Sequence, residues 1–115
     1  MSSISLSTHV LDTAKGLPAA GVPVVLEQRD PGGRWLPLSD ALTDGDGRIG
    51  NLVPPGAELP AGRYRVVFDL ESAVLPAGPG WYPEVSIVVD LAAGSGHSHV
   101  PLLLAPYGYT TYRGS

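Results

Sequence analysis

Three histidines are the side chains of this sequence best suited to acid–base chemistry. They are His9, His97 and His99, and the chain has no others. His97 and His99 are two residues apart, so a strand would point both side chains to one face. A neutral imidazole is a base near pH 7 and also a common zinc ligand. The three histidines could therefore serve metal-free catalysis, bind a metal, or be inert surface or core residues.

The end of the chain is a second candidate. Residues 107–112 are aromatic, hydroxyl-bearing and β-branched apart from one glycine, which is typical of a strand, and the sequence ends Tyr112-Arg113-Gly114-Ser115. Chain ends usually fray, but an ordered end would bring a guanidinium, a hydroxyl and a carboxylate to one place. We therefore expect the tail to contribute to a site with the histidines.

Other motifs narrow the possible chemistry. Arg48 ends the turn-forming segment 43–48, where a solvated arginine is the usual outcome. The acidic residues of that segment lack the ligand spacing and the bidentate glutamate of a calcium loop. The sequence has neither a serine-nucleophile elbow nor a phosphate-binding loop motif. Because it has no cysteine, thiol catalysis, disulfides and cysteine-based zinc sites are excluded.

The composition predicts one domain spanning residues 1–115, a length sufficient for a single core. Hydrophobic residues make up 43% of the chain, which argues against disorder. With a net charge of −4 and only 7 lysines and arginines, a nucleic-acid partner is not expected. No apolar run approaches the roughly 20 residues of a membrane-spanning helix, and we recognise no signal peptide. We therefore expect a cytoplasmic protein without membrane association.

The elements that must position these side chains are short strands. The chain contains 15 glycines and 12 prolines, which divide it into short segments. About seven or eight strands at spacings of about ten residues predict an all-β sandwich, with one short helical segment at 71–75 before a proline. The expected strands and apolar patches are 4–11, 22–26, 35–38, 49–53, 62–70, 85–90, 97–104 and 109–113.

Several motifs occur in a characteristic order along the chain. They are Leu6-Ser7-Thr8-His9-Val10-Leu11-Asp12-Thr13, Gly16-Leu17-Pro18-Ala19, Thr43-Asp44-Gly45-Asp46-Gly47-Arg48, His99-Val100-Pro101-Leu102-Leu103-Leu104 and Tyr109-Thr110-Thr111-Tyr112-Arg113-Gly114-Ser115. Together they resemble the transthyretin-related 5-hydroxyisourate hydrolases of purine breakdown, over nearly the whole chain.

The resemblance implies a fold, an assembly and a reaction. The fold is a transthyretin-like β-sandwich, assembled as a homotetramer (a dimer of dimers) with its sites in the channel between the dimers. The reaction is hydrolysis of 5-hydroxyisourate in urate degradation, with no metal or cofactor. The implied catalytic residues are His9, Arg48 and His99, and the implied substrate-binding residues are Tyr112, Arg113, Gly114 and Ser115.

Two positions depart from the family pattern. Ser98 stands between the two histidines, where the family usually has an aromatic residue, and Ala105 stands where it usually has serine. In a strand, Ser98 should point away from the face of His97 and His99. We therefore expect packing rather than chemistry to differ.

Some alternatives remain open at this point. Either His9 or His99 could be the general base, and Arg113 either lines the site or anchors the tail through an ion pair. Transthyretin itself is a carrier of small hydrophobic hormones, so a binding protein is a rival function. A zinc hydrolase with His9, His97 and His99 as ligands is another.

Overall fold

The strands form where apolar and polar residues alternate, because alternate side chains of a strand point to opposite faces of its sheet. The protein is described here by a computed structural model covering residues 3–114. Nine strands are present in these residues, and two of them are only two residues long. The strands are β1 (Ser5–Asp12), β2 (Leu17–Pro18), β3 (Pro23–Arg29), β4 (Trp35–Leu42), β5 (Arg48–Ile49), β6 (Gly62–Asp69), β7 (Glu84–Leu91), β8 (His97–Ala105) and β9 (Gly108–Thr111).

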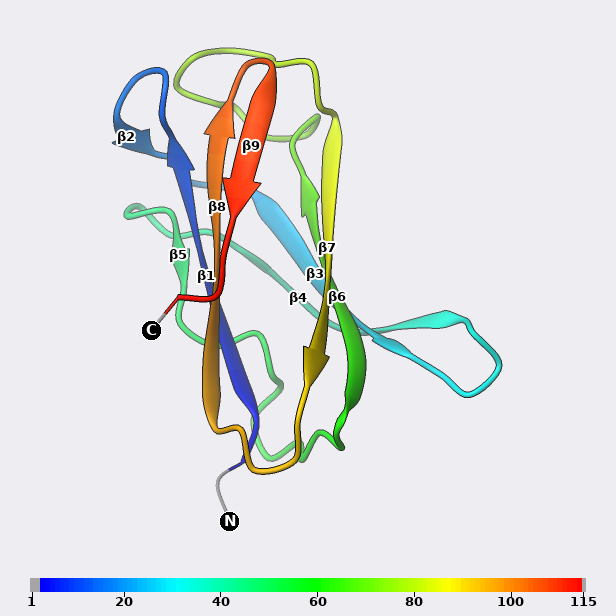
Figure 1. The fold of residues 1–115 in the computed structure, drawn as a ribbon. Helices are drawn as coiled ribbons and strands as arrows, with labels where there is room; N and C mark the ends of the chain where they lie inside the picture. Colours follow the sequence, from blue (N-terminus) through cyan, green and yellow to red (C-terminus); the bar gives the residue numbers. More distant parts are fainter. Residues whose placement is uncertain (1–2, 115) are drawn as a thin grey trace.

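The strands form two sheets that face each other (Figure 1). The first has the order β2-β1-β8-β9, and β5 also pairs with β1. The second has the order β4-β3-β6-β7. All pairs are antiparallel except β1 with β8, which run parallel over eight residue pairs although they lie at opposite ends of the sequence. This arrangement confirms the predicted all-β sandwich.

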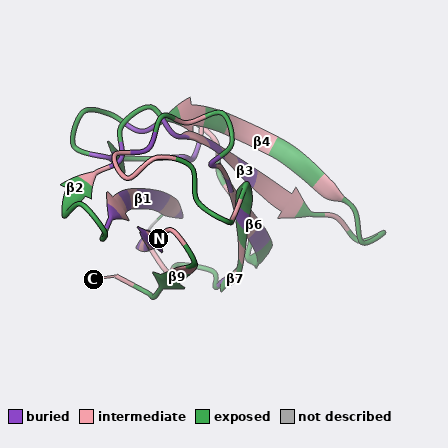
Figure 2. Ribbon diagram, turned by 90° about the horizontal axis from the view of Figure 1, so that it is seen from above, coloured by how far each residue is buried: buried purple, intermediate pink, exposed green. Residues whose placement is uncertain are grey.

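The core lies between the two sheets. Leu6 and Val10 of β1, Leu102 of β8, and Tyr64 and Phe68 of β6 are fully buried there. In Figure 2 the buried positions follow β1, β3 and β6, whereas the tip of the β3–β4 hairpin is exposed. Because one face of the β1–β8 pair fills this core, the other face is left outside the sandwich.

The predicted helical segment at 71–75 is wrong, since no helix occurs in residues 3–114. The Asp69 carboxylate instead accepts hydrogen bonds from the backbone N–H of Ser72 at 3.1 Å and from its hydroxyl at 2.7 Å. Such local side-chain bonds compete with helix formation, and Pro76 leaves too little length for a helix to propagate. Accordingly, the described part of the chain has no helix that could cross a membrane.

Candidate active site

The register of β1 and β8 gathers the histidines on the outer face of the first sheet. Ser5 pairs with His97, Ser7 with His99, and His9 with Pro101. Side chains at alternate positions share a face, so these residues point away from the core that Leu6 and Val100 enter. A pocket of about 360 Å³ is lined there by Ser7, Thr8, His9, Arg48, Ile49, Gly50, His97 and His99. The structure thus brings together the three residues expected to be catalytic.

Arg48 reaches this pocket because a turn folds back onto β1. The Asp44 carboxylate closes the turn by accepting the backbone N–H groups of Asp46 and Arg48, both at 2.9 Å. The backbone N–H of Val10 then donates to the carbonyl of Gly47 at 2.8 Å. As a result Arg48 stands directly opposite His9 in the β1–β5 pair.

The same turn determines which nitrogen of His9 carries a hydrogen. Nε2 of His9 lies 2.9 Å from the backbone carbonyl oxygen of Asp46. A carbonyl oxygen can only accept a hydrogen bond, so Nε2 must be the protonated nitrogen. In the neutral ring, Nδ1 of His9 is therefore the basic atom.

The surroundings of His99 favour its neutral form. Burial lowers the pKa of His99 from its ordinary value, and repulsion from protonated His9, from protonated His97 and from Arg48 lowers it further. Both effects disfavour the imidazolium form. His99 is consequently a neutral, basic imidazole at pH 7, as a general base requires.

Two serine hydroxyls connect the histidines. The Ser7 hydroxyl lies 2.7 Å from Nδ1 of His99 and 2.8 Å from Nε2 of His97. The Ser5 hydroxyl lies 2.6 Å from Nδ1 of His97. We assigned neither serine a role from the sequence, although their spacing of two and four residues before His9 would have placed them on the same face of a strand.

The chain end packs against His99 through Gly114. The N–H of Gly114 donates to the carbonyl of His99 at 2.8 Å, which forms an isolated bridge beyond β9. A Cβ at position 114 would lie 2.5 Å from Cδ2 of His99, so the ring occupies the space of a side chain. The predicted contribution of Ser115 lies outside the described residues.

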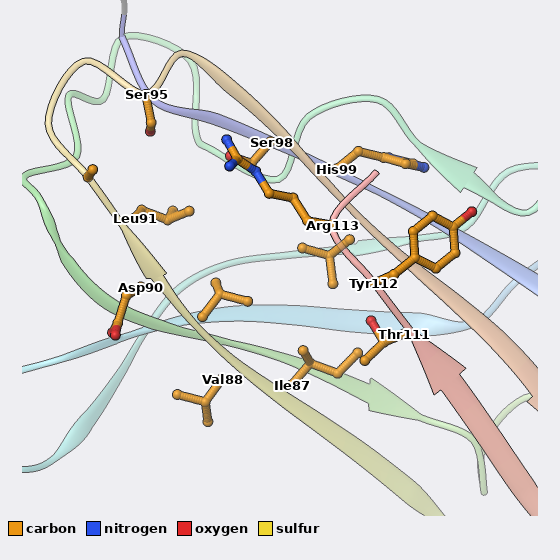
Figure 3. A pocket seen from close by; sticks show the side chains of 13 residues that line it. Ile87, Val88, Asp90, Leu91, Ser95, Ser98, His99, Thr111, Tyr112 and Arg113 are labelled. Carbon is orange, nitrogen blue, oxygen red and sulfur yellow. The ribbon is translucent and has the colours of Figure 1, made fainter. Parts of the chain in front are cut away.

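Tyr112 and Arg113 point to opposite sides of the tail. In Figure 3, Tyr112 lies on the same side as His99, whereas Arg113 extends toward Ser98. Arg113 and Ser98 line a second pocket of about 440 Å³, which His99 and Tyr112 also border and whose wall is largely aliphatic residues of β7. Ser98 thus faces away from the histidine face, as predicted. Arg113 is not among the residues that line the pocket of His9 and Arg48.

An anchoring ion pair for Arg113 is not found among residues 3–114, where the ion pairs are Arg63–Asp90 and Arg65–Glu27. These residues also contain no group of three His, Asp or Glu side chains placed to hold a metal ion. The proposed three-histidine zinc site therefore gains no geometric support.

Gly47 allows the turn of residues 43–48 to pack closely on β1. Gly47 has a φ of +75°, and a Cβ there would lie 2.5 Å from the Val10 carbonyl oxygen. We expect Gly47→Ala to destabilise the protein by more than the roughly 1–2 kcal/mol that this backbone conformation alone costs an L-residue, because the turn must also move off β1. Thermal unfolding measures this change.

Gly45→Ala is the matched control in the same turn, since a Cβ at Gly45 meets nothing within 4 Å. Its melting temperature should stay close to that of the unmodified protein. Equal melting temperatures for both variants would contradict the assigned packing of the turn on β1.

Comparison with known proteins shows which family this chain resembles. A family model described as the HIUase/Transthyretin family matches residues 6–114. The 5-hydroxyisourate hydrolase of Salmonella typhimurium is 46% identical over 114 residues, which cover 96% of this chain and 80% of that protein.

Solved structures give the same result. The 5-hydroxyisourate hydrolase of Klebsiella pneumoniae is 36% identical with a TM-score of 0.81, and each chain is covered completely. Transthyretin from Sparus aurata is 33% identical with a TM-score of 0.84 over 95% of each chain. Similarity therefore extends to both a hydrolase and a transthyretin, and the polar pocket must distinguish between them.

Proposed function

Because this chain belongs to the HIUase/Transthyretin family, we propose that it is an enzyme that hydrolyses 5-hydroxyisourate in urate degradation. The product is 2-oxo-4-hydroxy-4-carboxy-5-ureidoimidazoline. The observation that carries the proposal is the shared pocket of His9, Arg48 and His99. It combines two imidazole bases with one permanently charged guanidinium. A carrier of hydrophobic hormones has no need of this polar set, so we favour the hydrolase over a binding protein.

Ring opening begins with attack of water on the activated lactam carbonyl. His99 takes the proton of this water at Nε2, because its Nδ1 is engaged by Ser7 and because its surroundings keep the ring neutral. His9 lies on the same face and orients the water or substrate through Nδ1, since its Nε2 is bonded to Asp46. General acid–base catalysis of this kind typically increases the reaction rate about 10²–10⁴-fold.

Arg48 acts on the substrate, whereas His99 acts on the water. Its guanidinium binds the polar heterocycle by charge-assisted hydrogen bonds and stabilises the negative charge that develops on the carbonyl oxygen. When the tetrahedral intermediate collapses, the ring C–N bond breaks and the departing nitrogen takes a proton back from Nε2 of His99. The chemistry uses no cofactor and leaves the protonation of the enzyme unchanged after each turnover.

The chain end and the assembly complete the proposal. Gly114 and Tyr112 form a wall beside His99, and Ser115 orients the substrate or a histidine. We propose that Arg113 positions the chain end and does not bind the substrate, since it extends toward Ser98. A homotetramer with its sites between dimers is consistent with a pocket on an outer sheet face, where another chain could cover it. A cytoplasmic location stays a prediction.

The proposal is tested by a direct assay. Freshly generated 5-hydroxyisourate decays slowly by itself, and its ultraviolet absorbance can be followed with and without the protein. We expect micromolar protein to accelerate the decay strongly and the His99→Gln variant to do so far less. Decay at the spontaneous rate with the folded, unmodified protein would refute the assignment.

A further inference from the structure

Ser7 occupies an unusual position for a serine in a strand. It is only 8% exposed, and its hydroxyl lies between two imidazole rings contributed by the neighbouring strand β8. The register that pairs Ser7 with His99 fixes this placement. The position of the Ser7 hydroxyl is thus fixed by the pairing of β1 with β8, because Ser7 lies in a strand and not in a loop.

The contacts form a continuous chain of hydrogen-bonding atoms. It runs from the Ser5 hydroxyl to Nδ1 of His97, then from Nε2 of His97 to the Ser7 hydroxyl, and finally to Nδ1 of His99. The three distances are 2.6, 2.8 and 2.7 Å, all within hydrogen-bonding range. The other nitrogen of His99, Nε2, makes no hydrogen bond within residues 3–114 and is available to the pocket.

The direction of these bonds decides which nitrogen of His99 is basic. A serine hydroxyl has one hydrogen, so between two imidazoles it must donate to one and accept from the other. If Ser7 donates to Nε2 of His97, it accepts from Nδ1–H of His99, and Nε2 of a neutral His99 is then a free base. If the direction is reversed, Nε2 of His99 carries the hydrogen and can donate it.

We propose that Ser7 is a positioning residue that holds His99 with Nε2 basic toward the pocket and relays a proton between His99 and His97. This inference rests on the proposed hydrolase function, because it assigns the step in which water is activated. Ser7 acts through His99, because its hydroxyl is bonded to Nδ1 of that ring.

The proton transfers along this relay balance without any added reagent. Nε2 of His99 takes a proton from water, and Nδ1 of His99 passes its own proton to Ser7. The original Ser7 proton moves to Nε2 of His97, while the proton on Nδ1 of His97 passes to Ser5 and on to solvent. The reverse sequence restores all groups when Nε2 of His99 protonates the departing nitrogen. His97 is exposed in the single chain, which places this end of the relay at the surface of the protomer.

The relay is tested with Ser7→Ala and Ser7→Thr. We expect Ser7→Ala to lower kcat about 10²-fold, as expected when a catalytic group loses its orientation, with little change in KM because Arg48 is untouched. Ser7→Thr keeps the hydroxyl and should recover most of the lost kcat. A kcat for Ser7→Ala within about twofold of the unmodified enzyme would overturn the proposal.

A second measurement needs no substrate. Ring nitrogen chemical shifts from ¹⁵N-labelled protein report which His99 nitrogen carries the hydrogen, with a His99→Gln spectrum identifying the signals. We expect hydrogen on Nδ1 in the unmodified protein at pH 7.5 and a mixture of tautomers in Ser7→Ala. An unchanged tautomer in Ser7→Ala, together with retained folding by thermal melting, would show that Ser7 does not orient His99.

The two measurements also separate this inference from the function on which it rests. If the unmodified protein failed to hydrolyse 5-hydroxyisourate, the proposed function would be wrong, but the nitrogen shifts would still test the Ser7–His99 contact. If hydrolysis occurred and the tautomer did not depend on Ser7, only the relay would be wrong.

Discussion

Replacing His99 with glutamine is expected to lower kcat/KM for 5-hydroxyisourate about 10²–10⁴-fold, the usual contribution of general acid–base catalysis. Glutamine retains hydrogen-bonding groups but cannot take a proton from water at pH 7. Since the His99 side chain lies on the outer face of the sheet, the melting temperature should change little. Steady-state kinetics and thermal unfolding check both parts.

The control is His97→Gln, two residues away on the same face. It interrupts the relay but leaves Nε2 of His99 in the pocket, so its loss of activity should be smaller. A larger loss in His97→Gln than in His99→Gln would show that the wrong member of the pair has been chosen as the base.

The pH dependence of the unmodified enzyme provides an independent check on His99. Burial, followed by repulsion from protonated His9, protonated His97 and Arg48, lowers the pKa of His99. The ring therefore stays neutral, and the base stays active, to a lower pH than an ordinary histidine would allow. The acid limb of kcat/KM should have its midpoint below about 6.5, the value of an unperturbed histidine. Arg48→Ala removes one of these charges, so the midpoint of its residual activity should move upward.

The second large effect is expected for Gly114→Ala, which should lower kcat/KM about 10²-fold. An added Cβ would lie 2.5 Å from Cδ2 of His99 and 3.1 Å from its Cβ and Cγ, so either the ring or the chain end must move. A displacement of about 1 Å in a catalytic group is sufficient for a loss of this size. The assay that follows 5-hydroxyisourate decay measures it.

Gly108→Ala is the matched control, because Gly108 begins the preceding strand β9 and a Cβ there meets nothing within 4 Å. Its activity should remain near that of the unmodified enzyme. The loss caused by Gly114→Ala should also largely disappear in a His99→Gln background, since both changes act on one group. Full additivity of the two changes would contradict this coupling.

Local pattern was sufficient to predict the elements and several of the site residues. Alternation of apolar and polar residues predicted the sandwich, and along β6 it placed Tyr64, Val66 and Phe68 on one face, which is buried. Residue type marked His9 and His99 as candidates, whereas the catalytic role of Arg48 came from the resemblance to a known family; all three line one pocket. At 71–75 the same reasoning failed, because a single carboxylate–serine contact outweighed a weak helical tendency.

The sequence alone determined which residues share a face within one strand, because that depends only on the two-residue period of the chain. It therefore separated Ser98 from His97 and His99. It could not determine which residues of different strands meet, since register is set by burial of the whole core and by strand pairing. Only the tertiary structure placed Ser7 between two histidines about 90 residues away, packed Gly114 on His99 and directed Arg113 to the opposite side.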